Sequence, residues 1–514
     1  MLPQGENKVK MDNTDLTKVL RFIEENMRVT EQTSIEYLDS QGVMDRLKIK
    51  QNHIVFGRRG SGKSLLLKSL RNFADVECIS VNLEDFKDIS FPNSIIQVQK
   101  TIVKQLIPKV SSAYSWYSID RLKKTLPLKR RLNKQIKSLD HHLSHPDIYD
   151  QEVKEKRSRK GTAKAKKKAF GGEGEGTFEA SNESELSKQL KVDKLDILKN
   201  DLSNIKELFS DVANHIGKNI FLILDDFYFI RKDEQPYFID FFHRVSKNIP
   251  LYLKVATIQH RSKLYIQDES YVGVELPHDA QPIYLDYSLQ DFDRLVSFKR
   301  QLLAHINQKA GVEVDYNSLI TDNAFRFLCL ASGGVPRDFF SLLISLEPLF
   351  GGGKSVSKPN VIEKAIENVK NKMDTLKKDA SDEEVLLEHY LRLIRAEIIE
   401  NKKWNAFLLS NSEVQKHPQI NQAIKELVDL RFIHLVNPNT SASNSDGTRY
   451  SAYMLDIGLF PNSNPRDFQQ VEPGQTDDKH RQDKIRSAPK LDLGSFSTQI
   501  TDLNLPRELE VTEG

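Results

Sequence analysis

One short stretch constrains the fold of this chain more than any other. Residues 57–64 read Gly-Arg-Arg-Gly-Ser-Gly-Lys-Ser and match the pattern G-x-x-x-x-G-K-[ST]. An apolar run, His53 to Phe56, precedes them and predicts a buried strand, while the leucine-rich stretch from Ser64 to Arg71 predicts a helix. Glycines let the backbone curl until its N–H groups point to one centre, and the positive end of the helix dipole points there too. This order of elements predicts a phosphate-binding loop within a parallel α/β sheet.

A second apolar strand completes the predicted site. Residues 220–224 read Ile-Phe-Leu-Ile-Leu and end in Asp225 and Asp226. Carboxylates there could simply solvate a strand end, but the carboxyl ends of parallel strands are also where open α/β sheets bind ligands. We expect Lys63 to reach the β- and γ-phosphates of a bound nucleotide, and Ser64 and Asp225 to hold Mg²⁺. Asp226 is the candidate that polarises the attacking water, and since Asp is shorter than Glu, slow hydrolysis is expected.

Later polar residues are candidates for sensing the nucleotide. Thr257 follows the next predicted strand, and Arg261 lies just beyond, where a guanidinium could reach the nucleotide of a neighbouring subunit or remain a surface arginine. Gly333 and Gly334 end one predicted helix, and Pro336 and Arg337 begin the next. The predicted catalytic residues are Lys63, Asp226 and Arg261. The predicted nucleotide-binding residues are Gly57, Arg58, Arg59, Gly60, Ser61, Gly62, Lys63, Ser64, Leu65, Thr257, Pro336 and Arg337.

The periodicity and composition along the 514 residues predict several segments. Alternating strands and helices indicate the parallel sheet, and helix–helix–strand–strand over 401–460 is typical of a winged helix. The predicted segments are a helical region (1–45), an ATPase core (46–288) with an insertion at about 111–205 that is basic and low-complexity at 154–186, a helical lid (289–378), a winged helix (379–460) and a polar tail (461–514).

Charge is distributed unevenly. Between residues 121 and 168 there are 17 Lys and Arg against 5 Asp and Glu, a local charge of +12, so the rest of the chain carries about −9 to give the net +3. Two cysteines exclude a disulfide framework and a cysteine-based zinc site. Without an apolar run of membrane-spanning length or a hydrophobic signal core, the expected location is the cytoplasm, with no membrane partner.

These elements, in the order GRRGSGKS, LILDD, ATIQHR, GGVPR and winged helix, resemble AAA+ ATPases of the origin-recognition type and the neighbouring STAND ATPases. The resemblance covers roughly residues 40–460 without the insertion. It implies ATP binding with Mg²⁺, hydrolysis, a helical lid, and a homo-oligomer with nucleotide at subunit interfaces. The insertion and the tail depart from the family pattern. The absence of sensor repeats favours a chain that works with a protein partner.

Three functional hypotheses remain open from the sequence. The first is an ATPase that assembles a larger machine on DNA; in bacteria such proteins often belong to mobile-element or antiviral systems, which is an analogy. The second is a DNA-binding initiator or loader, and the third is an ATP-bound scaffold with little hydrolysis. The basic block at 121–168 is the better DNA footprint, because the predicted recognition helix, about 419–430, carries one basic residue, Lys425. A solvated lysine-rich loop and a protein-docking winged helix are the alternatives.

Overall fold

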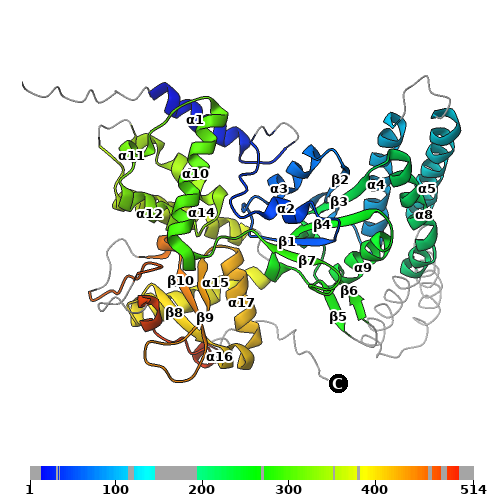
Figure 1. The fold of residues 1–514 in the computed structure, drawn as a ribbon. Coiled ribbons are helices and arrows are strands. Elements are labelled where there is room, and N and C mark those ends of the chain that lie inside the picture. Colours follow the sequence, from blue (N-terminus) through cyan, green and yellow to red (C-terminus); the bar gives the residue numbers. More distant parts are fainter. Residues whose placement is uncertain are drawn as a thin grey trace, which may run out of the picture. The chain divides into compact units, whose positions relative to one another are not determined.

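The computed structural model describes residues 13–30, 33, 35–113, 121–144, 194–267, 271–350, 354–378, 382–460, 466–475 and 483–496 (Figure 1). The chain divides into two compact units. We name residues 42–56 and 66–284 the sheet unit, and residues 1–41, 57–65 and 285–514 the lid unit. The glycine loop therefore belongs to the lid unit, although it directly follows a strand of the sheet unit.

Five parallel strands form the centre of the sheet unit, in the order β2-β3-β4-β1-β7. They are β1 (His53–Phe56), β2 (Val76–Asn82), β3 (Asn219–Asp225), β4 (Leu251–Thr257) and β7 (Gln281–Tyr284). The five central residues of β3 are buried, as expected for a parallel strand covered on both faces. Phe56 pairs with Thr257 and Tyr284, and Leu224 pairs with Val255, so the carboxyl ends of these strands share one edge.

Some helices of this part of the chain pack on the sheet, and others pack on those helices. They are α2 (Val43–Leu47), α3 (Lys63–Ser69), α4 (Asn93–Ser112), α5 (Leu126–Ser144), α8 (Leu202–Ile216) and α9 (Gln235–Ser246). Helix α4 packs on β2, α8 and α9 pack on β4, and α5 packs on α4 and α8 (Figure 1). A small hairpin, β5 (Tyr265–Gln267) with β6 (Tyr271–Gly273), packs on α9. The lysine-rich run at 154–168 and the rest of the low-complexity segment 154–186 lie outside the described residues.

Helices form the first part of the lid unit. They are α1 (Asn13–Asn26), α10 (Phe292–Ala310), α11 (Tyr316–Leu319), α12 (Asp322–Ala331), α13 (Pro336–Ser345) and α14 (Lys358–Lys378). Thr321 caps α12 by accepting the N–H of Ala324, and Pro336 occupies the first turn of α13, where its missing N–H costs nothing. One apolar core joins these helices to the C-terminal elements.

The C-terminal elements are α15 (Asp382–Arg395), α16 (Asn411–Lys416), α17 (Pro418–Asp429) and an antiparallel sheet in the order β8-β10-β9. The strands are β8 (Ala406–Ser410), β9 (Ile433–Thr440) and β10 (Tyr450–Leu455). The α/β fold class predicted from the sequence, with its parallel sheet and many helices, is confirmed, and the winged helix stays a prediction. Strand β8 was not predicted, because a short apolar run reads equally well as a buried helical turn.

Part of the segment beyond residue 460 packs onto this C-terminal sheet. The Leu408 N–H donates to the Pro489 carbonyl, and the Leu491 N–H donates to the Leu408 carbonyl, each at 2.8 Å. Val471, Ile485 and Leu493 are fully buried. In the described stretches of the chain, no helix is both long and apolar enough to cross a membrane.

Candidate nucleotide-binding site

The loop at residues 57–64 adopts a backbone that demands its glycines. Gly60 and Gly62 have φ of 87° and 98°, a region that residues with a Cβ avoid. A Cβ on Gly57 would lie 2.3 Å from Ser61 Oγ, and one on Gly60 would lie 2.6 Å from Arg337 Cβ. The pattern of glycines in the sequence is therefore a steric requirement of this loop.

The side chain of Lys63 folds back onto the first residues of this loop. The residue is buried, and its Nζ donates to the Gly57 carbonyl at 2.7 Å and to the Arg58 carbonyl at 3.1 Å. Ser61 Oγ is also buried and has no hydrogen-bond partner in the part of the chain that the structure describes. A buried ammonium within a glycine-dependent loop, beside a buried hydroxyl without a partner in the described residues, fits a site that is completed by an anionic ligand.

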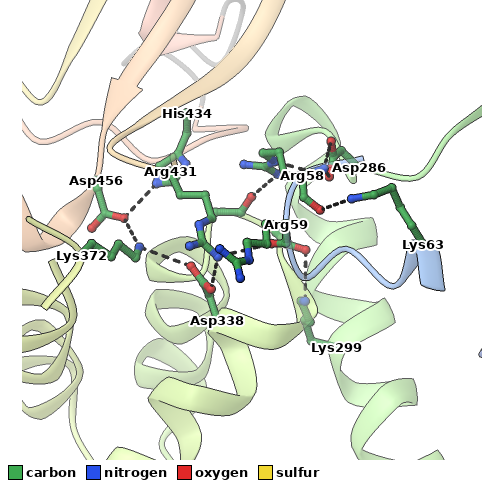
Figure 2. A network of polar contacts seen from close by, with 12 residues as sticks. Arg58, Arg59, Lys63, Asp286, Lys299, Asp338, Lys372, Arg431, His434 and Asp456 are labelled. Carbon is green, nitrogen blue, oxygen red and sulfur yellow. Dashed lines mark hydrogen bonds and ion pairs between the residues drawn. The ribbon is translucent and has the colours of Figure 1, made fainter. Parts of the chain in front are cut away.

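The predicted lid residues lie directly against this loop. The Arg337 N–H donates to the Gly60 carbonyl at 3.3 Å, which brings Pro336 and Arg337 to the loop as the sequence predicted. Arg58 donates to the Gly333 carbonyl at 2.7 Å (Figure 2). Lys299 of α10 donates to the Gly334 carbonyl at 3.1 Å, and its complete burial lowers the pKa of this amine to about 7. Both glycines of the sequence GGVPR thus accept hydrogen bonds from basic side chains.

Asp286 is a loop partner that the sequence analysis did not identify. Its carboxylate accepts the backbone N–H of Arg58 at 3.0 Å and forms an ion pair with the Arg58 side chain at 3.4 Å. The loop and its lid contact contribute four cationic side chains, Arg58, Arg59, Lys63 and Arg337. Such a concentration of basic side chains at one loop favours an anionic ligand.

A second polar network connects the loop to the C-terminal elements (Figure 2). Arg431, the second residue after α17, donates to Asp338 Oδ1 at 2.5 Å and to the Arg59 carbonyl at 3.3 Å. Lys372 of α14 lies 3.3 Å from the other oxygen of Asp338 and 3.7 Å from Asp456. Two cations and two carboxylates balance here, so this network needs no added charge. Arg431 adjoins the predicted recognition helix, and that position was its only signal in the sequence.

His434 of β9 also belongs to this network. Its Nε2 hydrogen-bonds to Asp456 Oδ2 at 3.2 Å, and both side chains are buried. Burial outweighs the neighbouring Asp456 and lowers the pKa of His434, which favours the neutral ring with its Nε2–H donating. A Cβ on Gly333 would lie 2.3 Å from the His434 ring, so this close approach requires glycine.

The remaining predicted residues lie in the sheet unit. Asp225 ends β3 and its carboxylate accepts the N–H of Asp226, which has a left-handed φ of 55°. Thr257, at the end of β4, is fully buried, and its hydroxyl is 2.5 Å from Ser262 Oγ. Since Ser262 itself donates to the Ile258 carbonyl, Thr257 must be the donor of that pair. Thr257 therefore has only lone pairs left for a ligand or a water.

Arg261 lies in a short 3₁₀ turn, Gln259–Arg261, that follows β4. Its carbonyl accepts a hydrogen bond from Gln235 Nε2 at 3.2 Å, and the Arg261 side chain is half-buried. No group of three or more His, Cys, Asp or Glu side chains in the described ranges could hold a metal by itself. Mg²⁺ usually keeps several waters and binds through one or two carboxylates plus substrate phosphates, so the predicted pair of Ser64 and Asp225 does not require such a group.

The sequence matches no protein-family model, and no curated protein matches it at a significant level. Among solved structures, the Orc1 protein of Aeropyrum pernix in complex with DNA is similar to this chain. The identity is 11%, the match covers 86% of this chain and 90% of that one, and the TM-score is 0.30. This neighbour is of the origin-recognition type named by the sequence resemblance. At this identity and TM-score, no property of the Aeropyrum protein carries over to this chain.

Proposed function

We propose that this protein is an ATPase of the AAA+ type that binds ATP with Mg²⁺ at residues 57–64. The observation that carries the proposal is the position of Lys63. Its buried ammonium rests on loop carbonyls, within a glycine-dependent loop that follows a buried parallel strand. Phosphate oxygens carry more charge than carbonyls, so the same ammonium gains by exchanging these acceptors for the β- and γ-phosphates.

Hydrolysis is proposed to use the two aspartates at the end of β3. In the reaction, a water oxygen forms a bond to the γ-phosphorus and the bond to the β,γ-bridging oxygen breaks, so that ADP leaves with the electron pair. Asp226 is proposed to position that water and accept its proton, while Asp225 and Ser64 hold Mg²⁺. Lys63 stabilises the charge that develops on the phosphates. The short Asp226 side chain leads us to expect slow or partner-activated turnover.

The lid is proposed to respond to the γ-phosphate. Arg337 is the second residue of α13 and its N–H already donates to the loop, so a small movement of the loop would move the first turn of that helix. Arg58 links the loop to Gly333, and Lys299 of α10 holds the neighbouring Gly334 just before α13. The protein is further proposed to form a homo-oligomer in which Arg261 contacts the nucleotide of a neighbouring subunit.

DNA is proposed as the platform on which the assembly works. The support is the charge of +12 over residues 121–168 on a chain that is otherwise acidic. Deleting residues 154–168 should weaken DNA binding and leave ATP hydrolysis at its basal rate. Equal DNA affinity with and without that segment would remove it from the DNA-binding surface.

The ATPase proposal is tested by turnover of radiolabelled ATP. Lys63→Ala should reduce turnover to background, while Asp226→Asn should bind ATP without hydrolysing it. Wild-type turnover in Asp226→Asn would exclude Asp226 from the reaction, and wild-type turnover in Lys63→Ala would refute the site. Mixing Arg261→Ala with Lys63→Ala subunits should restore activity if Arg261 acts on a neighbouring subunit, because one interface in the mixture is then intact.

A further inference from the structure

Helix α5 is anchored through one face and leaves the other exposed. Leu128, Leu132 and Leu139 are buried in the core of the sheet unit, where α5 packs on α4 and α8. Arg131, at the side of the helix, pairs with Glu207 and Asp211 of α8, at 3.0 and 2.5 Å. The orientation of α5 about its own axis is therefore determined by its leucines and by this double ion pair.

The exposed face carries a basic stripe, Arg130, Lys134 and Lys137. At about 100° per residue, these three positions fall within about 60° of one another and about 180° from the buried leucines. All three side chains are exposed, and no carboxylate pairs with them in the part of the chain that the structure describes. The one acidic residue of α5, Asp140, instead pairs with Lys100 of α4. Among the described residues, these three side chains therefore face solvent, where an external partner could reach them.

The spacing of the stripe suits a nucleic-acid backbone. Arg130 to Lys137 spans about 10 Å of helix axis, since an α-helix rises about 1.5 Å per residue. One strand of duplex DNA presents a phosphate about every 3.4 Å of its axis, so the stripe faces about three phosphates. Lys123 and Lys124, in the turn just before α5, are also exposed and extend the positive surface toward the helix N-terminus.

Other partners fit this face less well. Helix α5 contains no Phe, Tyr or Trp, so it offers no surface on which single-stranded bases could stack. Its Leu128, Leu132 and Leu139 are buried in the protein, and the single exposed Leu126 at the start of the helix is too small an apolar surface to insert into a membrane interface. What this face offers is a row of positive side chains that matches a row of backbone phosphates, without groups that would recognise particular bases.

We propose that the basic stripe of α5 binds the phosphate backbone of duplex DNA without sequence preference. This inference rests on the proposed function only in taking DNA as the partner, and it does not depend on the proposed ATP site. Because each neutralised phosphate contributes about 0.9 to the slope of log K against log salt concentration, three contacts contribute a slope of about 2.7.

The test is duplex binding by the full-length protein, measured by fluorescence anisotropy at several salt concentrations. Arg130→Gln/Lys134→Gln/Lys137→Gln should bind tenfold or more weakly at about 0.1 M salt, with a slope shallower by about 2.7. Arg130→Lys/Lys134→Arg/Lys137→Arg keeps the charges and should bind like wild type. An unchanged slope in the glutamine variant, or a wild-type protein without duplex affinity at about 0.05 M salt, would overturn the proposal.

The matched control removes three lysines that precede β1, β3 and β4 in the same unit, as Lys50→Gln/Lys218→Gln/Lys247→Gln. It should retain wild-type affinity, and an equal loss there would mean that net charge alone explains the binding. Duplex RNA is the second probe, and tighter binding to it than to DNA would overturn the choice of partner. Lys63→Ala should keep the full salt dependence, so a failed ATP site and a failed DNA surface give different results.

Discussion

Arg431 offers the sharpest test of how the loop is joined to the C-terminal elements. Its side chain is 17% exposed and its partner Asp338 is 9% exposed, so this ion pair is largely removed from water. Breaking a buried pair by removing one member costs about 3–5 kcal/mol, because the other charge is left unpaired. Here Lys372 remains 3.3 Å from Asp338 and compensates in part. We therefore expect Arg431→Ala to reduce the free energy of unfolding of the lid unit by about 2 kcal/mol.

The backbone at Arg431 provides a second variant with a different expected value. Its φ is 68°, which costs a residue with a Cβ about 1 kcal/mol relative to glycine. Arg431→Gly loses the same ion pair but relieves this strain, so it should be about 1 kcal/mol more stable than Arg431→Ala. Lys416→Ala is the control, because its 65% exposed side chain pairs with Glu413 at the surface, and about 0.5 kcal/mol or less is expected.

The assay is urea unfolding followed by the fluorescence of Trp404, which lies in the lid unit, in a Trp116→Phe background. Following one tryptophan keeps the unfolding of the lid unit separate from that of the sheet unit. A loss in Arg431→Ala no larger than in Lys416→Ala would refute the buried ion pair. Equal stability of the Ala and Gly variants would refute the strained backbone.

Three further predictions concern other positions. Gly60→Ala should weaken ATP binding at least tenfold in calorimetry, because its Cβ would lie 2.6 Å from Arg337 Cβ at a φ of 87°; unchanged affinity would exclude this loop geometry. Gly458→Ala should lower the melting temperature of the lid unit, because its Cβ would lie 2.2 Å from the Ala365 carbonyl oxygen; an unchanged value would exclude that contact. Burial lowers the pKa of His53 to about 4, below its unfolded value of about 6.5, so the stability that His53 contributes to the sheet unit is fully present above pH 6.5 and is lost as the pH falls toward 4. Hydrogen exchange of β1 measures this loss, and His53→Asn should reduce it; equal pH dependence in the variant would remove His53 as the cause.

Much of the sheet could be predicted because its strands are continuous apolar runs. β3 and β4 were expected from the chain alone, and so was the helix after Lys63, since burial on both faces leaves a recognisable pattern. β8 was missed because five residues are too few to separate a strand from a buried helical turn. The polar composition after residue 460 predicts a tail, yet part of that segment packs on the C-terminal sheet. It is held there by backbone hydrogen bonds to Leu408, and such bonds do not depend on which side chains the segment carries.

The part of the site that lies within one motif could be predicted, and the part assembled across the chain could not. Lys63 and the loop glycines can be recognised from their spacing in the sequence alone. Asp338 and Arg431 are 93 residues apart, and neither belongs to a motif. Their pairing depends on how α13 and the turn after α17 pack, which no local pattern encodes. Asp286 is likewise an ordinary loop residue until the fold places it beside Arg58.

The central claim is that residues 57–64 hold ATP. Isothermal calorimetry of ATP with Mg²⁺, on wild type and on Lys63→Ala, tests it most directly. A lost ammonium–phosphate contact is worth about 1.5–3 kcal/mol, which corresponds to about 10- to 150-fold in affinity. The account predicts saturable, Mg²⁺-dependent binding to wild type, weakened in Lys63→Ala by at least this factor. Equal affinity of the two proteins, or no binding to either, would contradict it.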